Sequence, residues 1–302
     1  LSAIEYCLFY GCTKLTSIEI PDSVTEIKSN VFYRNTNIIS VKAPNVTTIN
    51  KGAFRECDNL SSVELPKAVT IGDNAFYQCG SLPAIDLPKA ETIGQQAFDF
   101  CEKLTSANMP EVKTIAKKAF NYCSSLKTVS MPKVENVGEW AFYMDFALDN
   151  VYIPNATTIG ERAFYQCYSI EHIYMTNATT LNRNAFGGMS ALIDMTVSDK
   201  LKTVDSDAFS SGSLFFFNTV YAPCDSDLDA VEATLSPCNF KSFTSIPHNF
   251  VDAKCTICGK EEIDLDEYKT EEKKEKDIKL LKEAKEEFDA QNYSKAYELI
   301  KD

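Results

Sequence analysis

Residues 71–88 read Ile-Gly-Asp-Asn-Ala-Phe-Tyr-Gln-Cys-Gly-Ser-Leu-Pro-Ala-Ile-Asp-Leu-Pro, and close copies of this phrase return along most of the 302-residue chain. A phenylalanine marks every copy at intervals of 22 residues, with an interval of 23 at each end of the series: Phe9, Phe32, Phe54, Phe76, Phe98, Phe120, Phe142, Phe164, Phe186 and Phe209. A fixed period of this length is typical of a solenoid, in which each unit buries its apolar face against its neighbours. The sequence therefore predicts a repeat protein.

The second half of the phrase predicts a short strand. Leu82, Ile85 and Leu87 have the spacing of a strand whose alternate residues point inward. Asp86 lies between two of these buried positions and is expected to point outward. Pro88 ends the strand, because proline has no amide hydrogen with which to continue a hydrogen-bonded ladder.

The first half of the phrase predicts a short helical turn. Asp73 is placed to cap this turn, and Ala75, Phe76 and Cys79 would lie on its inner side. Alanine is small enough to let the turn approach the next one closely. Each repeat is therefore expected to consist of a strand, a corner and a short helical piece.

Six cysteines stand three residues after a repeat phenylalanine: Cys12, Cys57, Cys79, Cys101, Cys123 and Cys167. An even number of cysteines in a secreted protein can indicate disulfides. The periodic position instead favours small, buried, apolar side chains on one interior column. We therefore expect these six thiols to be free and unreactive.

The repeat resembles the BspA-like subfamily of leucine-rich repeats, whose signature reads roughly I-G-x-x-A-F-x-x-C-x-x-L-x-x-I-x-x-P. The match runs from residue 4 to about residue 223. The cysteine is replaced by Asn35, Asp145 and Met189, and the proline by Thr176 and Ser198. The resemblance implies an α/β repeat fold: a right-handed, curved leucine-rich-repeat solenoid with parallel strands on its concave face. It also implies a secreted or surface-attached protein that acts in adhesion and binding.

Composition excludes some partners. The net charge is −13, and we find no basic stripe of the kind that binds nucleic-acid phosphates. No apolar run approaches the ~20 residues of a membrane span. Because the chain begins inside a repeat, we expect the natural N-terminus, with any signal peptide, to lie before residue 1. The expected location is the cell surface or the secreted fraction.

The chain is predicted to have three parts: a solenoid of about ten repeats over 1–223, a cap with a Cys/His-containing loop over 224–260, and an acidic helical hairpin or linker over 261–302. The last part holds fifteen Asp and Glu against nine Lys. Its apolar residues have helical spacing: Ile278, Leu281, Ala284 and Phe288. Residues 284–296 resemble the turn region of a tetratricopeptide repeat, and a solvated linker helix is the alternative.

The predicted cap contains a half-motif for zinc. His248, Cys255 and Cys258 have the spacing of a zinc knuckle, and Cys238 is the nearest candidate for a fourth ligand. No other cofactor is predicted. The alternatives are a disulfide between Cys224 and Cys238 with a second between Cys255 and Cys258, or reduced cysteines in a loop.

The outward-facing strand positions change character along the array. One column reads Glu19, Lys42, Glu64, Asp86, Asn108, Ser130, Tyr152, Tyr174, Thr196 and Tyr221. The column two positions earlier ends in Asn150, His172, Asp194 and Thr219. The candidate binding patch therefore consists of Asn150, Tyr152, His172, Tyr174, Asp194 and Tyr221. Tyrosine combines a flat apolar face with a polar end and suits protein and sugar ligands; the alternative is that tyrosine is simply a favourable strand residue.

An enzyme is the competing class of function. Asp194 could orient His172, but no serine or cysteine stands on a strained turn or helix start as a nucleophile. We therefore expect a non-enzymatic binding protein. Its ligand would be a host protein, for example of the extracellular matrix, or a protein of another microbe. A carbohydrate-binding module and an intracellular protein-interaction scaffold are the alternatives.

Overall fold

The computed structural model describes residues 2–209, 219–223, 226–235 and 238, together with the backbone of three short strands between residues 243 and 255. The chain divides into two compact units. The first comprises residues 1–222 and 227–244, and the second comprises residues 223–226 and 245–302. Each unit is described by itself.

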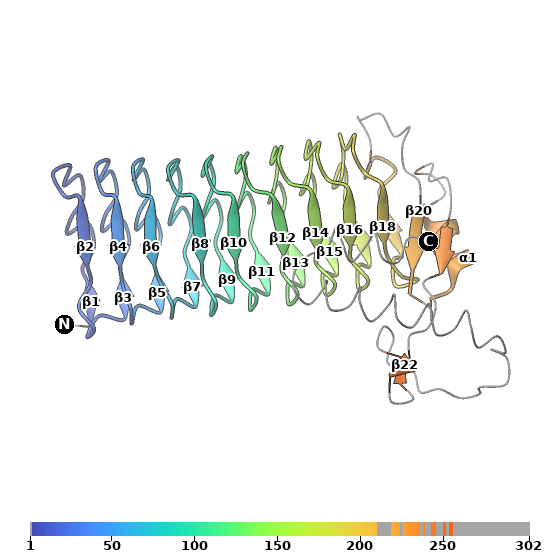
Figure 1. The fold of residues 1–302 in the computed structure, drawn as a ribbon, viewed down its shortest axis with the longest axis horizontal. Helices are drawn as coiled ribbons and strands as arrows, with labels where there is room; N and C mark the ends of the chain where they lie inside the picture. The colour runs from blue at the N-terminus through green and yellow to red at the C-terminus, as the bar shows by residue number, and fades with distance from the viewer. Residues whose placement is uncertain are drawn as a thin grey trace. The chain divides into compact units, whose positions relative to one another are not determined.

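The first unit is a parallel β-solenoid of about ten turns (Figure 1). We number each turn by its repeat phenylalanine, so that Phe9 belongs to the first turn and Phe142 to the seventh. Every turn has a long and a short strand. The long strands are β2 (Ser17–Glu19), β4 (Ser40–Lys42), β6 (Ser62–Glu64), β8 (Ala84–Asp86), β10 (Ser106–Asn108), β12 (Thr128–Ser130), β14 (Asn150–Tyr152), β16 (His172–Tyr174), β18 (Asp194–Thr196) and β20 (Thr219–Ala222). We call their outer surface the long-strand face.

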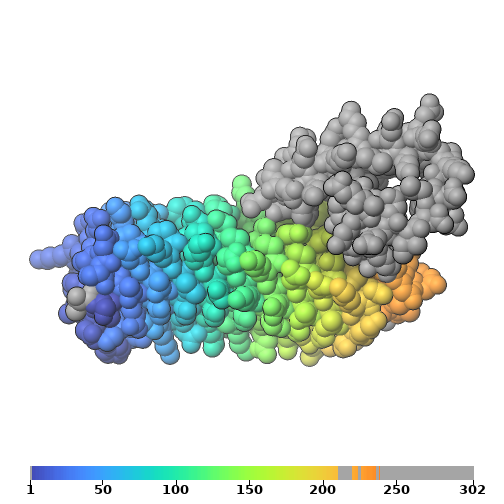
Figure 2. Space-filling view, turned by 90° about the horizontal axis from the view of Figure 1, so that it is seen from below, coloured from blue at the N-terminus to red at the C-terminus, as the bar shows by residue number. Residues whose placement is uncertain are grey.

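The short strands form one continuous parallel sheet of ten members. They are β1 (Ala3–Ile4), β3 (Glu26–Ile27), β5 (Thr48–Ile49), β7 (Thr70–Ile71), β9 (Thr92–Ile93), β11 (Thr114–Ile115), β13 (Asn136–Val137), β15 (Thr158–Ile159), β17 (Thr180–Leu181) and β19 (Thr203–Val204). The long strands form three sheets, β2–β4–β6, β8–β10 and β12 through β20 to β21 (Phe243–Ser245). In Figure 2 the turns follow one another as coloured bands. The 22-residue period therefore becomes a stack of equivalent positions.

The core is organised around the repeat phenylalanines. Their ten rings form one stack from Phe9 to Phe209, with centroids 5.0–5.5 Å apart and interplanar angles of 1–15°. All of them except Phe9 are buried. The side chains of Leu82, Ile85 and Leu87 are also buried, whereas Asp86 is exposed. The predicted strand and its alternation are therefore confirmed.

The predicted helical piece is wrong. Within residues 2–209 the segment around each phenylalanine is a series of turns and not an α-helix. In the fourth turn Asn74 and Gln78, two residues before and after Phe76, have φ values of +55° and +57°, which no right-handed helix contains. Asp73 does not cap a helix, because its Oδ1 accepts a hydrogen bond from the backbone N–H of Gln95 in the next turn at 2.8 Å.

The backbone of these turns bonds to neighbouring turns instead of forming a helix. The Phe76 N–H donates to the Ala97 carbonyl at 2.7 Å, and the Phe98 N–H donates to the Ala119 carbonyl at the same distance. Because left-handed residues on either side turn these peptide groups along the stack, the amides are satisfied between turns. The solenoid is thus hydrogen-bonded on this side as well as at its two strands.

Lys118 offers a test of the left-handed positions, because its φ is +59°. The left-handed conformation costs roughly 1–2 kcal/mol for a residue with a Cβ, and glycine avoids this at an entropic cost of about 0.5–1 kcal/mol. Because the Lys118 Nζ lies 5.5 Å from the centre of the Trp140 ring, the test compares two variants that both lose this contact. We expect Lys118→Gly to have a free energy of unfolding about 0.5–1 kcal/mol higher than Lys118→Ala, because only alanine keeps a Cβ in the left-handed conformation. Urea unfolding of both variants checks this; equal stabilities would contradict it.

Five of the six column cysteines are buried and free, as predicted: Cys57, Cys79, Cys101, Cys123 and Cys167. Cys12 is free but exposed, so its predicted burial is wrong: it lies in the first described turn, whereas each buried thiol packs against a described turn before its own. The buried thiols are also hydrogen-bond donors. Each Sγ lies 2.9–3.2 Å from the carbonyl oxygen of the phenylalanine 25 residues earlier.

The one helix among the described residues, α1 (Leu228–Leu235), follows the last long strand. Asp227 caps its start by accepting a hydrogen bond from the Ala230 N–H at 3.1 Å. Val231 and Leu235 are buried in the same apolar core as the repeats, so α1 closes that core. No helix within the described residues is both long and apolar enough to cross a membrane.

The second unit contains β22 (Phe250–Val251), which pairs antiparallel with β23 (Lys254–Cys255). The predicted acidic helical segment of residues 261–302, including the tetratricopeptide-like stretch 284–296, lies outside the described residues.

Candidate functional site

Strand register brings most of the predicted patch together on the long-strand face. Asn150 pairs with His172, and His172 pairs with Asp194. Tyr152 pairs with Tyr174, and their rings lie 5.2 Å apart between centroids with an interplanar angle of 33°. These five residues therefore occupy three neighbouring strands, β14, β16 and β18.

Tyr221 lies apart from the tyrosine pair. It stands on β20 opposite Thr196 of β18, so Thr196 separates it from Tyr174. The aromatic run that the sequence suggested is thus a pair of rings followed by a threonine and a third tyrosine.

His172 and Asp194 form a short polar contact within the patch. The His172 Nδ1 lies 2.8 Å from the Asp194 Oδ2, and the His172 Nε2 lies 3.9 Å from the Glu171 Oε2. Asp194 is 5% exposed. A carboxylate at this distance from Nδ1 fixes the orientation of the imidazole ring. The predicted pairing of these two residues is therefore present.

Asn150 has an unsatisfied acceptor. Its Nδ2 donates to the Asp149 Oδ1 at 2.9 Å, but its Oδ1 is buried and makes no hydrogen bond. The residue as a whole is 8% exposed. A buried acceptor without a donor is destabilising by about 1–3 kcal/mol.

Exposure falls along the long-strand face toward the C-terminal end. The outward residues of β2 to β10 are exposed: Glu19, Lys42, Glu64, Asp86 and Asn108. Tyr152, His172, Tyr174 and Tyr221 are half-buried, and Asn150 and Asp194 are buried. Burial accordingly raises the pKa of the Tyr174 hydroxyl. The positions that sequence alternation places outward are thus only partly accessible in the patch.

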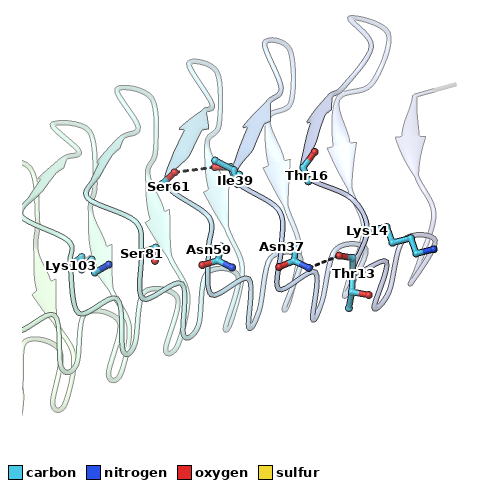
Figure 3. A pocket seen from close by; sticks show the side chains of 9 residues that line it. All are labelled: Thr13, Lys14, Thr16, Asn37, Ile39, Asn59, Ser61, Ser81 and Lys103. Atoms are coloured by element: carbon cyan, nitrogen blue, oxygen red, sulfur yellow. Dashed lines mark hydrogen bonds between the residues drawn. The ribbon is translucent and has the colours of Figure 1, made fainter.

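A surface hollow that sequence reasoning did not identify lies on turns one to five (Figure 3). All but one of its lining residues are of polar or charged types: Thr13, Lys14, Thr16, Asn37, Ile39, Asn59, Ser61, Ser81 and Lys103. The Asn37 Nδ2 donates to the Thr13 carbonyl at 2.7 Å, which holds the asparagine against the preceding turn. None of the lining residues belongs to the predicted patch. Lys14, Asn37, Asn59, Ser81 and Lys103 each stand five residues after a repeat phenylalanine, so reading that column of the sequence would have located the hollow.

Aromatic side chains also gather outside the long-strand face. Along the turns, ring contacts of 5.0–6.0 Å connect successive members of one stripe: Tyr77, Phe100, Tyr122, Tyr143 and Tyr165. A separate pair, Phe146 and Tyr168, is stacked at 5.7 Å and is 39% and 42% exposed. These residues stand one, two or four positions after the repeat phenylalanines, so reading those columns would have found them.

The predicted zinc ligands fall mostly outside the described residues. His248, Cys258 and the side chain of Cys255 are not described. Cys238 is free and buried, and burial raises the pKa of its thiol to about 11. Within the described part of the chain, no three His, Cys, Asp or Glu side chains are placed to hold a metal ion. The zinc site stays a prediction.

Comparison with known proteins identifies the repeat. A family model described as "BspA type Leucine rich repeat region (6 copies)" matches residues 1–105 and 91–215. No protein with a curated description matches the chain.

Several solved structures are similar to it. A leucine-rich repeat protein from Bacteroides ovatus is 24% identical with a TM-score of 0.63, and the match covers 82% of this chain and 64% of that one. A leucine rich cell surface protein from Faecalibacterium prausnitzii is 21% identical with a TM-score of 0.47, covering 82% and 83%. The T. pallidum leucine-rich repeat protein is 28% identical with a TM-score of 0.49, covering 52% and 78%. The first likeness supports the leucine-rich-repeat solenoid described above.

Proposed function

Because this chain belongs to the BspA-type leucine-rich repeat family, we propose that it is a non-enzymatic, surface-attached or secreted protein that binds a protein ligand through its long-strand face. The solenoid is a typical non-enzymatic scaffold, and leucine-rich repeat proteins generally bind proteins. Its parallel strands present side chains about 4.8 Å apart on successive turns. Such an array suits an extended surface for recognition.

The observation that carries the proposal is the cluster on β14, β16 and β18. Two tyrosine rings lie side by side, and the His172–Asp194 pair is fixed beside them. Rigid aromatic rings next to oriented polar groups are typical of the residues that dominate binding energy in protein interfaces. The partner would be a host matrix protein or a protein of another microbe.

A carbohydrate ligand is the second candidate. A flat tyrosine ring of the pair can pack against the apolar face of a sugar. An intracellular scaffold is the third. It depends on the tetratricopeptide-like stretch 284–296.

Replacing Tyr152 and Tyr174 together by alanine tests the proposed patch. Loss of two anchoring rings is expected to weaken binding by about 2 kcal/mol or more, which is about 30-fold in Kd. Binding is measured to immobilised extracellular-matrix extract and, separately, to a glycan array. Signal on the matrix alone supports a protein ligand, and signal on the array alone supports a glycan.

Tyr168→Ala serves as the matched control, because it removes an exposed tyrosine that is not on the long-strand face. It is expected to bind as the parent does. Undiminished binding of the Tyr152/Tyr174 double variant, or an equal loss in the control, would remove the patch from the proposal.

A further inference from the structure

Asp145 is a buried carboxyl group without a partner. It stands three residues after Phe142, at the position that cysteine occupies in six other turns. Its exposed fraction is 0%, and both carboxyl oxygens lack a hydrogen bond. A buried, unpaired carboxylate is among the least favourable groups that a core can contain. The chemistry of this column shows how the group can be accommodated.

Every other buried polar side chain described on the interior column donates a hydrogen bond to the turn before it. The Cys123 Sγ donates to the Phe98 carbonyl at 3.2 Å, and the Cys167 Sγ donates to the Phe142 carbonyl at 2.9 Å. Asn35 replaces cysteine in the second turn, and its Nδ2 donates to the Phe9 carbonyl at 2.7 Å. Each buried polar side chain at this position is thus a hydrogen-bond donor, and the ninth turn carries the apolar Met189 there instead.

The same offset places the Phe120 carbonyl opposite Asp145. This carbonyl already accepts the Cys123 N–H at 3.2 Å, and a carbonyl oxygen has a second lone pair available. An ionised carboxylate can only accept, so it would face this acceptor; the nearby backbone N–H of Cys123 favours the ionised form but already donates to the Phe120 carbonyl. A neutral carboxylic acid has one O–H to donate and can do what the thiols do in the neighbouring turns.

We propose that Asp145 links the sixth and seventh turns in a pH-dependent way. As a neutral acid it donates a hydrogen bond to the Phe120 carbonyl, and its ionisation removes this bond and loosens the packing between the two turns. The step moves one proton between Asp145 and solvent. It requires no other reactant, and it makes the stability of one turn depend on pH.

The groups around Asp145 favour the neutral acid. Burial raises its pKa well above the ordinary value, and the nearby Asp99 raises it further, whereas the backbone N–H of Cys123 lowers it. Its neighbours along the column are the thiols of Cys123 and Cys167, whose pKa values burial also raises, so both stay uncharged. Asp99 is held by the Gln96 Nε2 and the Asn121 Nδ2.

The sign of the pH dependence follows from linkage. A carboxyl group whose folded-state pKa is raised binds more protons in the folded than in the unfolded protein. Its contribution to stability is complete below the unfolded pKa of about 3.9 and is lost as pH rises toward the folded pKa. In that window the folding equilibrium constant should fall about tenfold per pH unit, relative to a protein without this group.

The test compares the parent with Asp145→Cys and Asp145→Asn across about pH 4 to 8 by urea unfolding. Cysteine restores the residue of the other turns, and asparagine keeps the shape with a donor, as Asn35 does. Both variants should unfold at higher urea concentration than the parent at pH 7, with the difference vanishing near pH 4. Asp86→Asn, at an exposed carboxylate on β8, should follow the parent.

Amide hydrogen exchange locates the effect. After correction for intrinsic chemistry, exchange in the sixth and seventh turns of the parent should speed up with pH more than exchange in the third turn. In Asp145→Asn the turns should respond alike. Equal pH dependence of the parent and Asp145→Asn in unfolding would overturn the proposal, and so would lower stability of Asp145→Asn than of the parent at pH 7.

Discussion

Phe120→Ala is expected to lower the free energy of unfolding by about 3–5 kcal/mol. Phe120 is 0% exposed, and its ring lies 5.1 Å from that of Phe98 and 5.2 Å from that of Phe142. Truncation removes the buried ring and leaves a cavity between two rings that the strands on either side hold in place. Urea unfolding of the parent and the variant measures the loss.

Phe9→Ala is the matched control, because Phe9 contacts only Phe32 within the stack and is partly buried. The same side chain is removed, but fewer protein atoms surround Phe9 than surround Phe120. A smaller loss is expected there. If Phe120→Ala unfolded at the same urea concentration as the parent, or if the two variants lost equal stability, the ring stack would not be the core of the solenoid.

Cys101→Asp is expected to lower the free energy of unfolding by about 4 kcal/mol at pH 7. Cys101 is 0% exposed, and its Sγ donates to the Phe76 carbonyl at 3.2 Å. Aspartate at this site must be protonated to donate in the same way. Keeping a carboxyl with an unfolded pKa of about 3.9 protonated at pH 7 costs about 1.36 kcal/mol per pH unit over about 3 units. Urea unfolding at pH 7 and pH 4 measures the difference.

Most of the lost stability should return near pH 4, where the unfolded chain is also largely protonated. Cys101→Ser is the matched control, because serine keeps a donor of similar size that does not titrate; its smaller loss should not change with pH. If Cys101→Asp were as unstable at pH 4 as at pH 7, the lost stability would come from poor packing of the aspartate side chain and not from its ionisation. Comparison of Cys101→Asp with the Asp145 variants shows whether the pH dependence belongs to this column position in general or to the seventh turn alone.

The proposed binding patch and Asp145 belong to the same region of the solenoid. Asp145 precedes β14 by only five residues, and β14 carries Asn150 and Tyr152. Loosening of the seventh turn would therefore act on the strand that holds part of the patch. The exposed, mostly charged residues on β2 to β10 and the hollow on turns one to five lie on other turns.

Much of the fold could be predicted because a solenoid contact is almost local in sequence. A residue at one position meets the residue 22 positions away, so a column read from the sequence is also a contact in space. Tyr152 beside Tyr174 and His172 beside Asp194 followed from this rule. The inward position of the phenylalanines followed from the same period.

The conformation of the turns could not be predicted in this way. Asp73 and the apolar residues after it have the spacing of a capped helical turn, and propensity alone favours that interpretation. The structure instead places Asn74 and Gln78 in the left-handed region, because the amides of this segment then bond to neighbouring turns along the whole stack. Because each of these hydrogen bonds joins two adjacent turns, the sequence of a single repeat does not predict it.

By itself, the sequence determined the period, the strands, the phenylalanine core and the residues that share a column, since each of these depends on spacing alone. Only the tertiary structure decided how much of each column is accessible and which polar atoms have partners. Burial depends on everything that packs around a position, so Cys12 and Cys57 differ in exposure although they occupy the same place in the repeat. For the same reason, Asp145 is an ordinary substitution in the sequence and an unpaired acid in the folded protein.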